Sequence, residues 1–146
     1  MSTERGDAAA KILLLLLLCA IAGAVAAPWF LRSKHTSQET KAIATLRRIH
    51  AAQTDHYGAS RLYATITMLK DAKRLPSSFR GDAFESEGYR FAHQPAGGWQ
   101  RWCAQAVPKE LGGVFAIDET GVVNEFPAGT SPCVAGKLTT AGTPVR

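Results

Sequence analysis

The sequence lacks the short motifs that mark the common catalytic and cofactor sites. It contains no G-x-S-x-G elbow, no Walker phosphate loop, no H-E-x-x-H helix and no C-x-x-C pair. Of the four histidines, His50 and His56 are six positions apart, so they fall on different faces of a helix and do not form a helical metal pair. These absences predict that the chain is not an enzyme. It should have no catalytic residue, no metal, no cofactor and no small-molecule substrate.

Charge is absent from residues 12 to 31. These twenty residues are rich in Leu at first and in Ala and Gly afterwards, and as a helix they would extend about 30 Å, one bilayer core. They predict a transmembrane helix over 12–31, after a short leader or cytoplasmic segment over 1–11. Pro28 predicts a kink in this helix, and Trp29 and Phe30 predict an anchor at the membrane interface.

A signal peptide is the alternative interpretation of the same apolar segment. Arg5 and Lys11 supply a positive start, and Ala24-Val25-Ala26 has the A-x-A form of a cleavage site. Cleavage after Ala26 would release a secreted protein. A lipoprotein signal ending at Cys19 is disfavoured, because a lipobox has a small residue before the cysteine.

Glycine and proline are absent from residues 32 to 57. Where the apolar stripe is tightest, its residues recur at intervals of three or four, which predicts an amphipathic helix that continues from the apolar segment and stops at Gly58. The residues of this apolar stripe are Ala42, Ile43, Leu46, Ile49 and Tyr57.

The rest of the chain predicts a short helix and then strands. The helix covers about 62–73, ahead of Pro76. Alternating residues predict strands over 89–93, 99–107, 114–117 and 122–126, with a hairpin turn at 118–121. Because the strands follow the helices without alternating with them, the expected fold class is α+β. A long N-terminal helix, transmembrane and then amphipathic, would pack against a small antiparallel sheet.

The chain has three cysteines, of which Cys103 and Cys133 fall outside the apolar segment. An exported protein meets an oxidising compartment, so export would favour a disulfide between these two residues. Two unpaired thiols remain the alternative. Cys19 is expected to pack as a small apolar side chain.

The chain is basic, with a formal net charge of +5 and a sequence pI of about 9.4. Arg61, Lys73 and Arg74 form a candidate contact for a polyanion such as DNA, and a solvated basic face is the plainer interpretation. An acidic run of Asp82, Glu85 and Glu87 follows them. It lacks the dense alternating oxygen ligands of a calcium loop and is interpreted as a solvated loop.

Two segments resemble the long N-terminal helix of type IV pilins and type II secretion pseudopilins. They are AAPWFLRSK at 26–34 and ETKAIATLRRI at 39–49. In that family a proline, an aromatic residue and a short basic patch close the apolar helix. Counting back from Pro28 by the family's spacing places leader cleavage between Gly6 and Asp7. The chain differs from the family at Asp7, where Phe or Met is usual, and at Lys11, where Glu is usual.

The resemblance implies a structural role. It implies a membrane-anchored subunit of a type IV pilus or type II secretion assembly, single-pass in the bacterial inner membrane. Residues 32–146, including the amphipathic helix over 32–57, would form a periplasmic or extracellular head. The implied partners are membrane lipid and identical or related subunits, with DNA as a weaker candidate. The alternative is a binding module for DNA or protein, released or anchored, with a signal peptide cleaved after Ala26.

Overall fold

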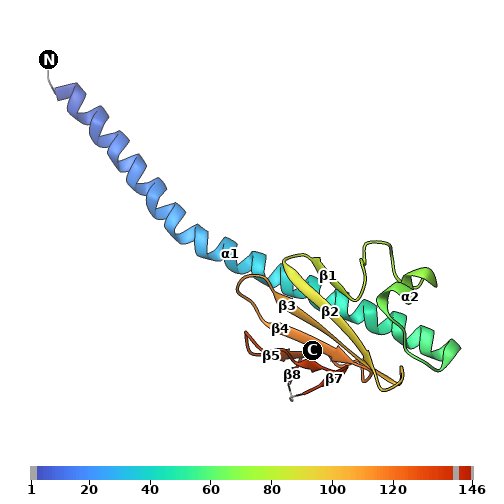
Figure 1. The fold of residues 1–146 in the computed structure, drawn as a ribbon. Coiled ribbons are helices and arrows are strands. Elements are labelled where there is room, and N and C mark those ends of the chain that lie inside the picture. The colour runs from blue at the N-terminus through green and yellow to red at the C-terminus, as the bar shows by residue number, and fades with distance from the viewer. Residues whose placement is uncertain (1–2, 140–141, 146) are drawn as a thin grey trace. The chain divides into compact units, whose positions relative to one another are not determined.

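The computed structural model describes the backbone of residues 3–139 and 142–145, and the side chains of residues 11–21, 33–139 and 142–145. The chain divides into two compact units, Met1–Thr36 and Ser37–Arg146. Helix α1, Thr3–Ser60, contributes to both units. All other elements belong to the second unit, which is called the head below (Figure 1).

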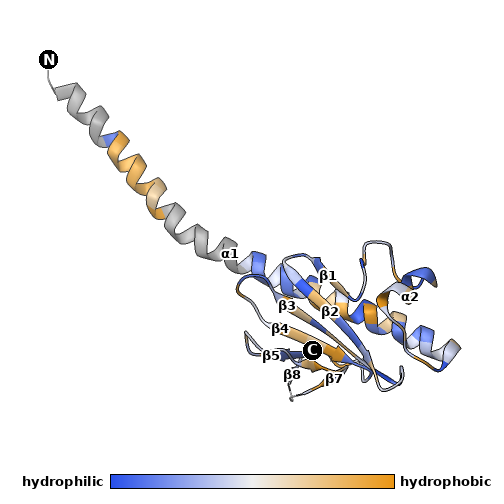
Figure 2. Ribbon diagram, in the orientation of Figure 1, coloured by the Kyte–Doolittle hydropathy of each residue, from blue (hydrophilic) through white to orange (hydrophobic). Residues whose placement is uncertain are grey.

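The expected transmembrane helix is not supported. Among the residues that the structure describes, no helix is both long enough and apolar enough to cross a membrane. Figure 2 colours the described apolar stretch, Ile12–Ile21, as hydrophobic. The predictions of a helix that is transmembrane and then amphipathic, and of a single-pass location in the inner membrane, are therefore wrong.

Within the head, α1 has one apolar face, as its sequence predicts. Ala42, Leu46, Ile49 and Ala52 are buried, whereas Lys41, Arg47 and Arg48 are exposed. The helix ends at Ser60, two residues beyond the predicted stop at Gly58. Arg61 ends it by adopting a left-handed backbone with φ of 60°, and its N–H donates to the carbonyl of Tyr57 at 2.8 Å.

Helix α2, Ile66–Asp71, is shorter than the predicted helix over 62–73. Thr65 caps its first turn, because the Thr65 hydroxyl accepts a hydrogen bond from the Met68 N–H at 3.1 Å. Lys73 has a positive φ of 56°, which prevents the helix from continuing. Ile66 and Leu69 form the buried side of α2.

One antiparallel sheet of six strands makes up most of the head, in the order β1-β2-β3-β4-β5-β8. Its strands are β1 Ala83–Ser86, β2 Tyr89–Ala96, β3 Arg101–Pro108, β4 Val114–Asp118, β5 Asn124–Phe126 and β8 Thr143–Pro144. The four predicted strands are confirmed in β2, β3, β4 and β5. Trp102 points into the core and is buried, whereas Trp99 precedes β3 in the turn and is exposed.

Strand β1 was not predicted, because its acidic residues indicated a loop. It pairs with β2 through a two-residue turn of Glu87 and Gly88, and Ser86 stands opposite Tyr89. Both turn residues have positive φ, 52° and 82°, as a tight hairpin that matches the strand twist requires. A side chain at Gly88 would also meet the amide of Gln38 in α1, with its Cβ 3.0 Å from Nε2.

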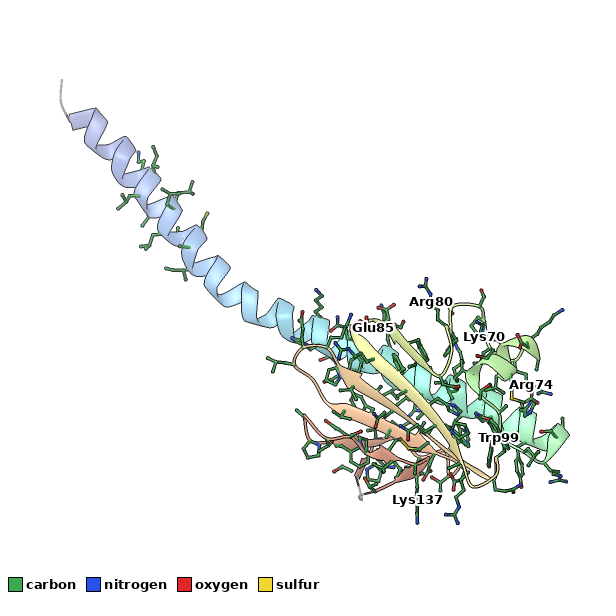
Figure 3. The ribbon with its side chains drawn as sticks, viewed as in Figure 1. Lys70, Arg74, Arg80, Glu85, Trp99 and Lys137 are labelled. Atoms are coloured by element: carbon green, nitrogen blue, oxygen red, sulfur yellow. A yellow bond between two sulfur atoms is a disulfide. The ribbon has the colours of Figure 1, made fainter. Side chains whose placement is uncertain are left out.

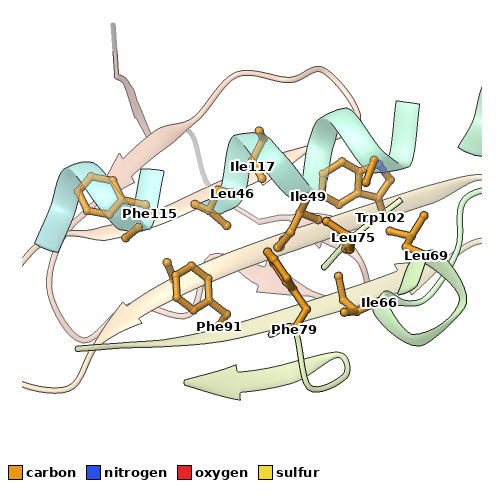
Figure 4. Close-up of a cluster of buried hydrophobic side chains, with 14 of the residues drawn as sticks. Leu46, Ile49, Ile66, Leu69, Leu75, Phe79, Phe91, Trp102, Phe115 and Ile117 are labelled. Atoms are coloured by element: carbon orange, nitrogen blue, oxygen red, sulfur yellow. The ribbon is translucent and has the colours of Figure 1, made fainter. Parts of the chain in front are cut away.

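The core lies between the sheet and the two helices (Figure 4). Leu46 and Ile49 of α1 share one hydrophobic cluster with Phe91, Trp102 and Phe115 of the sheet. Strand β4 is buried on both faces. Its residues Phe115 and Ile117 join this cluster, whereas Val114 and Ala116 belong to a second cluster. This explains the uninterrupted apolar run of β4.

The second cluster surrounds a disulfide between Cys103 of β3 and Cys133. The two Cα atoms are 5.8 Å apart, and the bond closes a loop across 30 positions. Cys133 belongs to a small hairpin of β6, Cys133–Val134, and β7, Lys137–Leu138. The predicted pairing of these two cysteines is therefore present, and Cys19 is free and exposed.

Removing the disulfide should destabilise the head. We expect the double variant Cys103→Ala/Cys133→Ala to lose about 3–4 kcal/mol of unfolding free energy, since the unfolded chain is no longer constrained by the closed loop. Urea denaturation followed by circular dichroism measures this loss. The variant Cys19→Ala is the matched control and should unfold at the wild-type urea concentration. Equal midpoints for all three proteins would contradict the prediction.

Candidate interaction surfaces

The first unit carries an exposed apolar segment, Ile12–Ile21 of α1. Every large hydrophobic side chain in it is exposed, from 55% at Ile21 to 73% at Leu13. Leu13 to Leu18 are consecutive, so they surround the helix rather than forming a single stripe (Figure 3). Lys11, also exposed, stands at the start of this segment. Residues 12–21 are called the leucine segment below.

A helix segment that is apolar on all sides normally has its surface covered. Full burial of one leucine side chain is worth about 1.5–3 kcal/mol. The leucine segment makes no tertiary contact that buries it among the described residues of its own unit. The leucine segment is therefore a candidate interaction surface.

The residues predicted for processing and anchoring fall outside the described side chains. These are Gly6 and Asp7 at the predicted leader cleavage, and Pro28, Trp29 and Phe30 at the predicted kink and anchor. The cleavage site after Ala26 falls outside them as well. Those predictions stay predictions.

The head has a hollow of about 290 Å³ between α1 and β1. One wall is a single face of α1, with Lys41, Ala44, Thr45 and Arg48 at helical spacing. The other walls are Ser78 and Phe79 of the segment after α2, and Phe84, Ser86 and Glu87 of the β1 hairpin. These nine residues define the α1–β1 hollow.

The α1–β1 hollow has an aromatic wall and two basic side chains, of which one is paired with an acidic residue and the other is not. The rings of Phe79 and Phe84 meet edge to face, with centroids 5.1 Å apart. At one end, Lys41 Nζ pairs with Glu87 Oε2 at 2.9 Å. At the other end Arg48 is exposed and has no ion pair or hydrogen bond to any described residue. The hollow therefore suits an apolar group with an adjacent negative charge.

The predicted polyanion patch is only partly assembled. Lys73 and Arg74 line one shallow hollow with Lys70, but Arg61 does not line it. The guanidinium of Arg74 forms an ion pair with Asp55, and its side chain is only 24% exposed. Arg74 is therefore largely used inside the head, and Arg61 and Lys73 are left as separate exposed charges.

The three acidic residues after this patch share no partner. Asp82 binds His93, Glu85 pairs with Arg90 and Lys109, and Glu87 pairs with Lys41. Hydrogen bonds from Lys109 and Arg90, opposed by slight burial, lower the pKa of Glu85. In the described part of the chain, no group of three or more His, Cys, Asp or Glu side chains could hold a metal ion.

A buried polar network joins four parts of the head at Gln53 of α1. Gln53 is fully buried, and its amide makes both backbone bonds to Ala64, which precedes α2. Its Nε2 donates to the carbonyl at 2.6 Å, and its Oε1 accepts from the N–H at 3.0 Å. These two bonds fix the orientation of the amide. The same Nε2 lies 2.8 Å from Nε2 of His93 on β2 and donates to it.

His93 passes the network on to Asp82. Because Nε2 of His93 accepts from Gln53, the ring proton is on Nδ1, which donates to Asp82 Oδ1 at 3.0 Å. The same Asp82 oxygen accepts from the Ile66 N–H at the start of α2, at 2.8 Å. Burial would raise the pKa of Asp82, but the hydrogen bonds from His93 and Ile66 outweigh it and lower the pKa below the ordinary 3.8.

This network is a structural clamp. His93 is 4% exposed, its ring lies 5.6 Å from that of Trp102, and both ring nitrogens have partners. Neither nitrogen is open to a substrate, so the His–Asp pair has no accessible base. The sequence carried no signal for this network, because Gln53, Ala64, Asp82 and His93 are far apart in the chain and belong to no motif.

Comparison of the chain with models of known protein families, with curated proteins and with solved structures finds no match.

Removing the Gln53 amide should destabilise the head strongly. In Gln53→Ala, the backbone groups of Ala64 and the ring of His93 lose their partners in a buried place, so we expect a loss of about 2–5 kcal/mol. Urea denaturation measures it. Gln100→Ala removes an exposed glutamine in the turn before β3 and should change stability by less than about 0.5 kcal/mol. Similar losses in both variants would contradict the clamp.

The clamp should also make the head sensitive to acid. Because folding lowers the pKa of Asp82, its contribution is fully present above the ordinary value of 3.8 and is lost as pH falls through the folded-state pKa. We expect the urea midpoint of wild type to fall more between about pH 6 and pH 3 than that of Asp82→Asn, whose amide keeps an acceptor but does not titrate. Asp71→Asn, at an exposed aspartate of α2, should follow wild type. A parallel fall in Asp82→Asn would refute the assignment.

Proposed function

We propose that this protein is a pilin-like structural subunit that associates with identical or related subunits through the leucine segment of α1. The observation that carries this proposal is the exposure of Ile12–Leu18 and Ile21 on all sides of one helix. Association between copies would cover these side chains on every copy, because each copy brings the same surface.

The energetics favour association over isolation. The leucine segment has eight large apolar side chains that are more than half exposed. If a partner covered even part of each, the gain at about 25 cal/mol per Å² would add up to several kcal/mol. Association costs translational and rotational freedom, so the gain must come from many residues together. A continuous leucine run meets this requirement better than single exposed residues do.

The head supports the same proposal. It is built on the continuation of the same helix, whose buried residues Leu46 and Ile49 pack against an antiparallel sheet. The pilin resemblance in the sequence implies a helix followed by such a sheet. The disulfide between Cys103 and Cys133 ties the last part of the chain to β3 and so stabilises the head.

Lys11 gives the proposed assembly a particular character. In the pilin family a glutamate at this place is thought to pair with the N-terminal amine of a neighbour. A lysine would repel that amine instead. The proposed association therefore depends on apolar packing along the leucine segment rather than on a charge pair at its start.

The test is assembly of the full chain with and without a charge in the leucine segment. Leu15 lies in the middle of the leucine segment, so Leu15→Lys places an ammonium group where subunits would pack. We expect this variant to sediment as a smaller species than wild type, because an unpaired buried charge costs several kcal/mol. Thr54→Lys adds the same charge at an exposed position of the head and should sediment like wild type.

The N-terminus of the protein from its native cell distinguishes this proposal from the alternative, a signal peptide that is cleaved after Ala26. Mass spectrometry that finds a chain beginning at Asp7 would leave the leucine segment in place and support the proposal. A chain beginning at Ala27 would lack that segment, and it would exclude the proposed mode of association. Unchanged sedimentation of Leu15→Lys would exclude it as well.

A further inference from the structure

The loop between β3 and β4 carries the most exposed large hydrophobic side chain described in this protein. Leu111 is 83% exposed, more than any residue of the leucine segment. Glu110 beside it is also exposed and forms no ion pair or hydrogen bond with a described residue. Glu110 and Leu111 are called the loop tip below.

Three hydrogen bonds join the base of this loop to the rest of the head. The Lys109 N–H donates to the carbonyl of Gly88 at 2.9 Å, and the Gly113 N–H donates to Glu39 Oε1 at 3.4 Å. On the same side, the hydroxyl of Tyr89 donates to the Gly113 carbonyl at 3.3 Å. Burial, with the nearby charges of Glu39 and Glu125, raises the pKa of Tyr89 to about 12, so this donor stays protonated at neutral pH.

The base of the loop is already hydrogen-bonded, whereas its tip has no partner. The loop tip can therefore bind a partner with little further loss of conformational entropy. The tip combines one apolar side chain with one negative charge. The α1–β1 hollow offers the complement, an aromatic wall of Phe79 and Phe84 and the unpaired guanidinium of Arg48. Both surfaces belong to every copy of the chain.

We propose that the loop tip of one copy docks into the α1–β1 hollow of a second copy. Leu111 would cover the aromatic wall, and Glu110 would pair with Arg48. This inference rests on the proposed function, for which it names the contact between heads. Because the tip and the hollow are different surfaces, a docked copy still offers a free hollow or a free tip, so the contact can repeat from copy to copy.

The charges around the hollow favour this occupant. Lys41 is already paired with Glu87, so the hollow has one uncompensated positive charge, which matches the single carboxylate of Glu110. A volume of about 290 Å³ admits one or two side chains rather than a folded segment. The Lys109 ammonium beside the tip pairs with Glu85 of its own head and therefore does not repel Arg48 strongly.

A cross-link between copies tests the contact. Full-length chains carrying Cys19→Ala, which removes the free thiol, are made with Ala44→Cys in the hollow or Leu111→Cys at the tip, and one of them carries a size tag. Mixing them under mild oxidation should give a hybrid disulfide product. Val134→Cys replaces Leu111→Cys as the control, because Val134 is exposed in the β6–β7 hairpin, away from the loop tip.

Charge exchange tests the pairing within the contact. Arg48→Glu in the Ala44→Cys chain should lower the hybrid yield about fivefold, because it replaces a weak attraction with a repulsion. Adding Glu110→Arg to the Leu111→Cys chain should restore the yield. If neither change alters the hybrid yield, the proposed pairing of Glu110 with Arg48 is overturned.

The outcomes separate this inference from the proposed function. A specific hybrid product supports the docking, even if Leu15→Lys leaves sedimentation unchanged and the leucine-segment model fails. The docking is overturned if no hybrid product forms, or if the Val134→Cys control gives as much hybrid product as Leu111→Cys. If Leu15→Lys still abolishes assembly in that case, the proposed function stands without this contact.

Discussion

The packing of one face of α1 against the sheet is the contact on which the rest of the head depends. Leu46 and Ile49 lie against Phe91, Trp102 and Phe115 (Figure 4). The helix therefore covers one face of strands β2, β3 and β4, and this face is buried only when the helix is in place. The sheet has only short strands at its two edges. Without the helix it would expose a large apolar face, which is an aggregation liability in water.

Gln53 adds specificity to this apolar contact. Apolar packing alone tolerates some sliding of a helix over a sheet. A buried amide that bonds Ala64 and His93 tolerates very little, because any shift leaves buried polar groups without partners. The same network reaches Asp82 and the start of α2, so one position of the helix sets the place of three other segments.

The two proposed contacts would contribute to association in different ways. The leucine segment supplies apolar area without direction, since its side chains surround the helix. The loop tip and the α1–β1 hollow supply a specific pairing of one side chain with one cavity and one charge with its opposite. Apolar area provides affinity, whereas complementary shape and charge decide which orientation is favoured.

The sequence by itself determined the amphipathic part of α1 and four of the strands, because each depends on the local period of apolar residues. It offered the pairing of Cys103 with Cys133 as one of two alternatives, and the structure decided in its favour. It overextended α2, since the cap at Thr65 and the left-handed Lys73 were not apparent, and it took β1 for a loop. It also predicted a transmembrane helix, which the described residues do not support.

Only the tertiary structure decided three features of the head. These are the clamp of Gln53, His93 and Asp82, the ion pair of Arg74 with Asp55, and the hollow beside Arg48. Those features join residues distant in the chain, and local patterns carry no information about which distant side chains will meet.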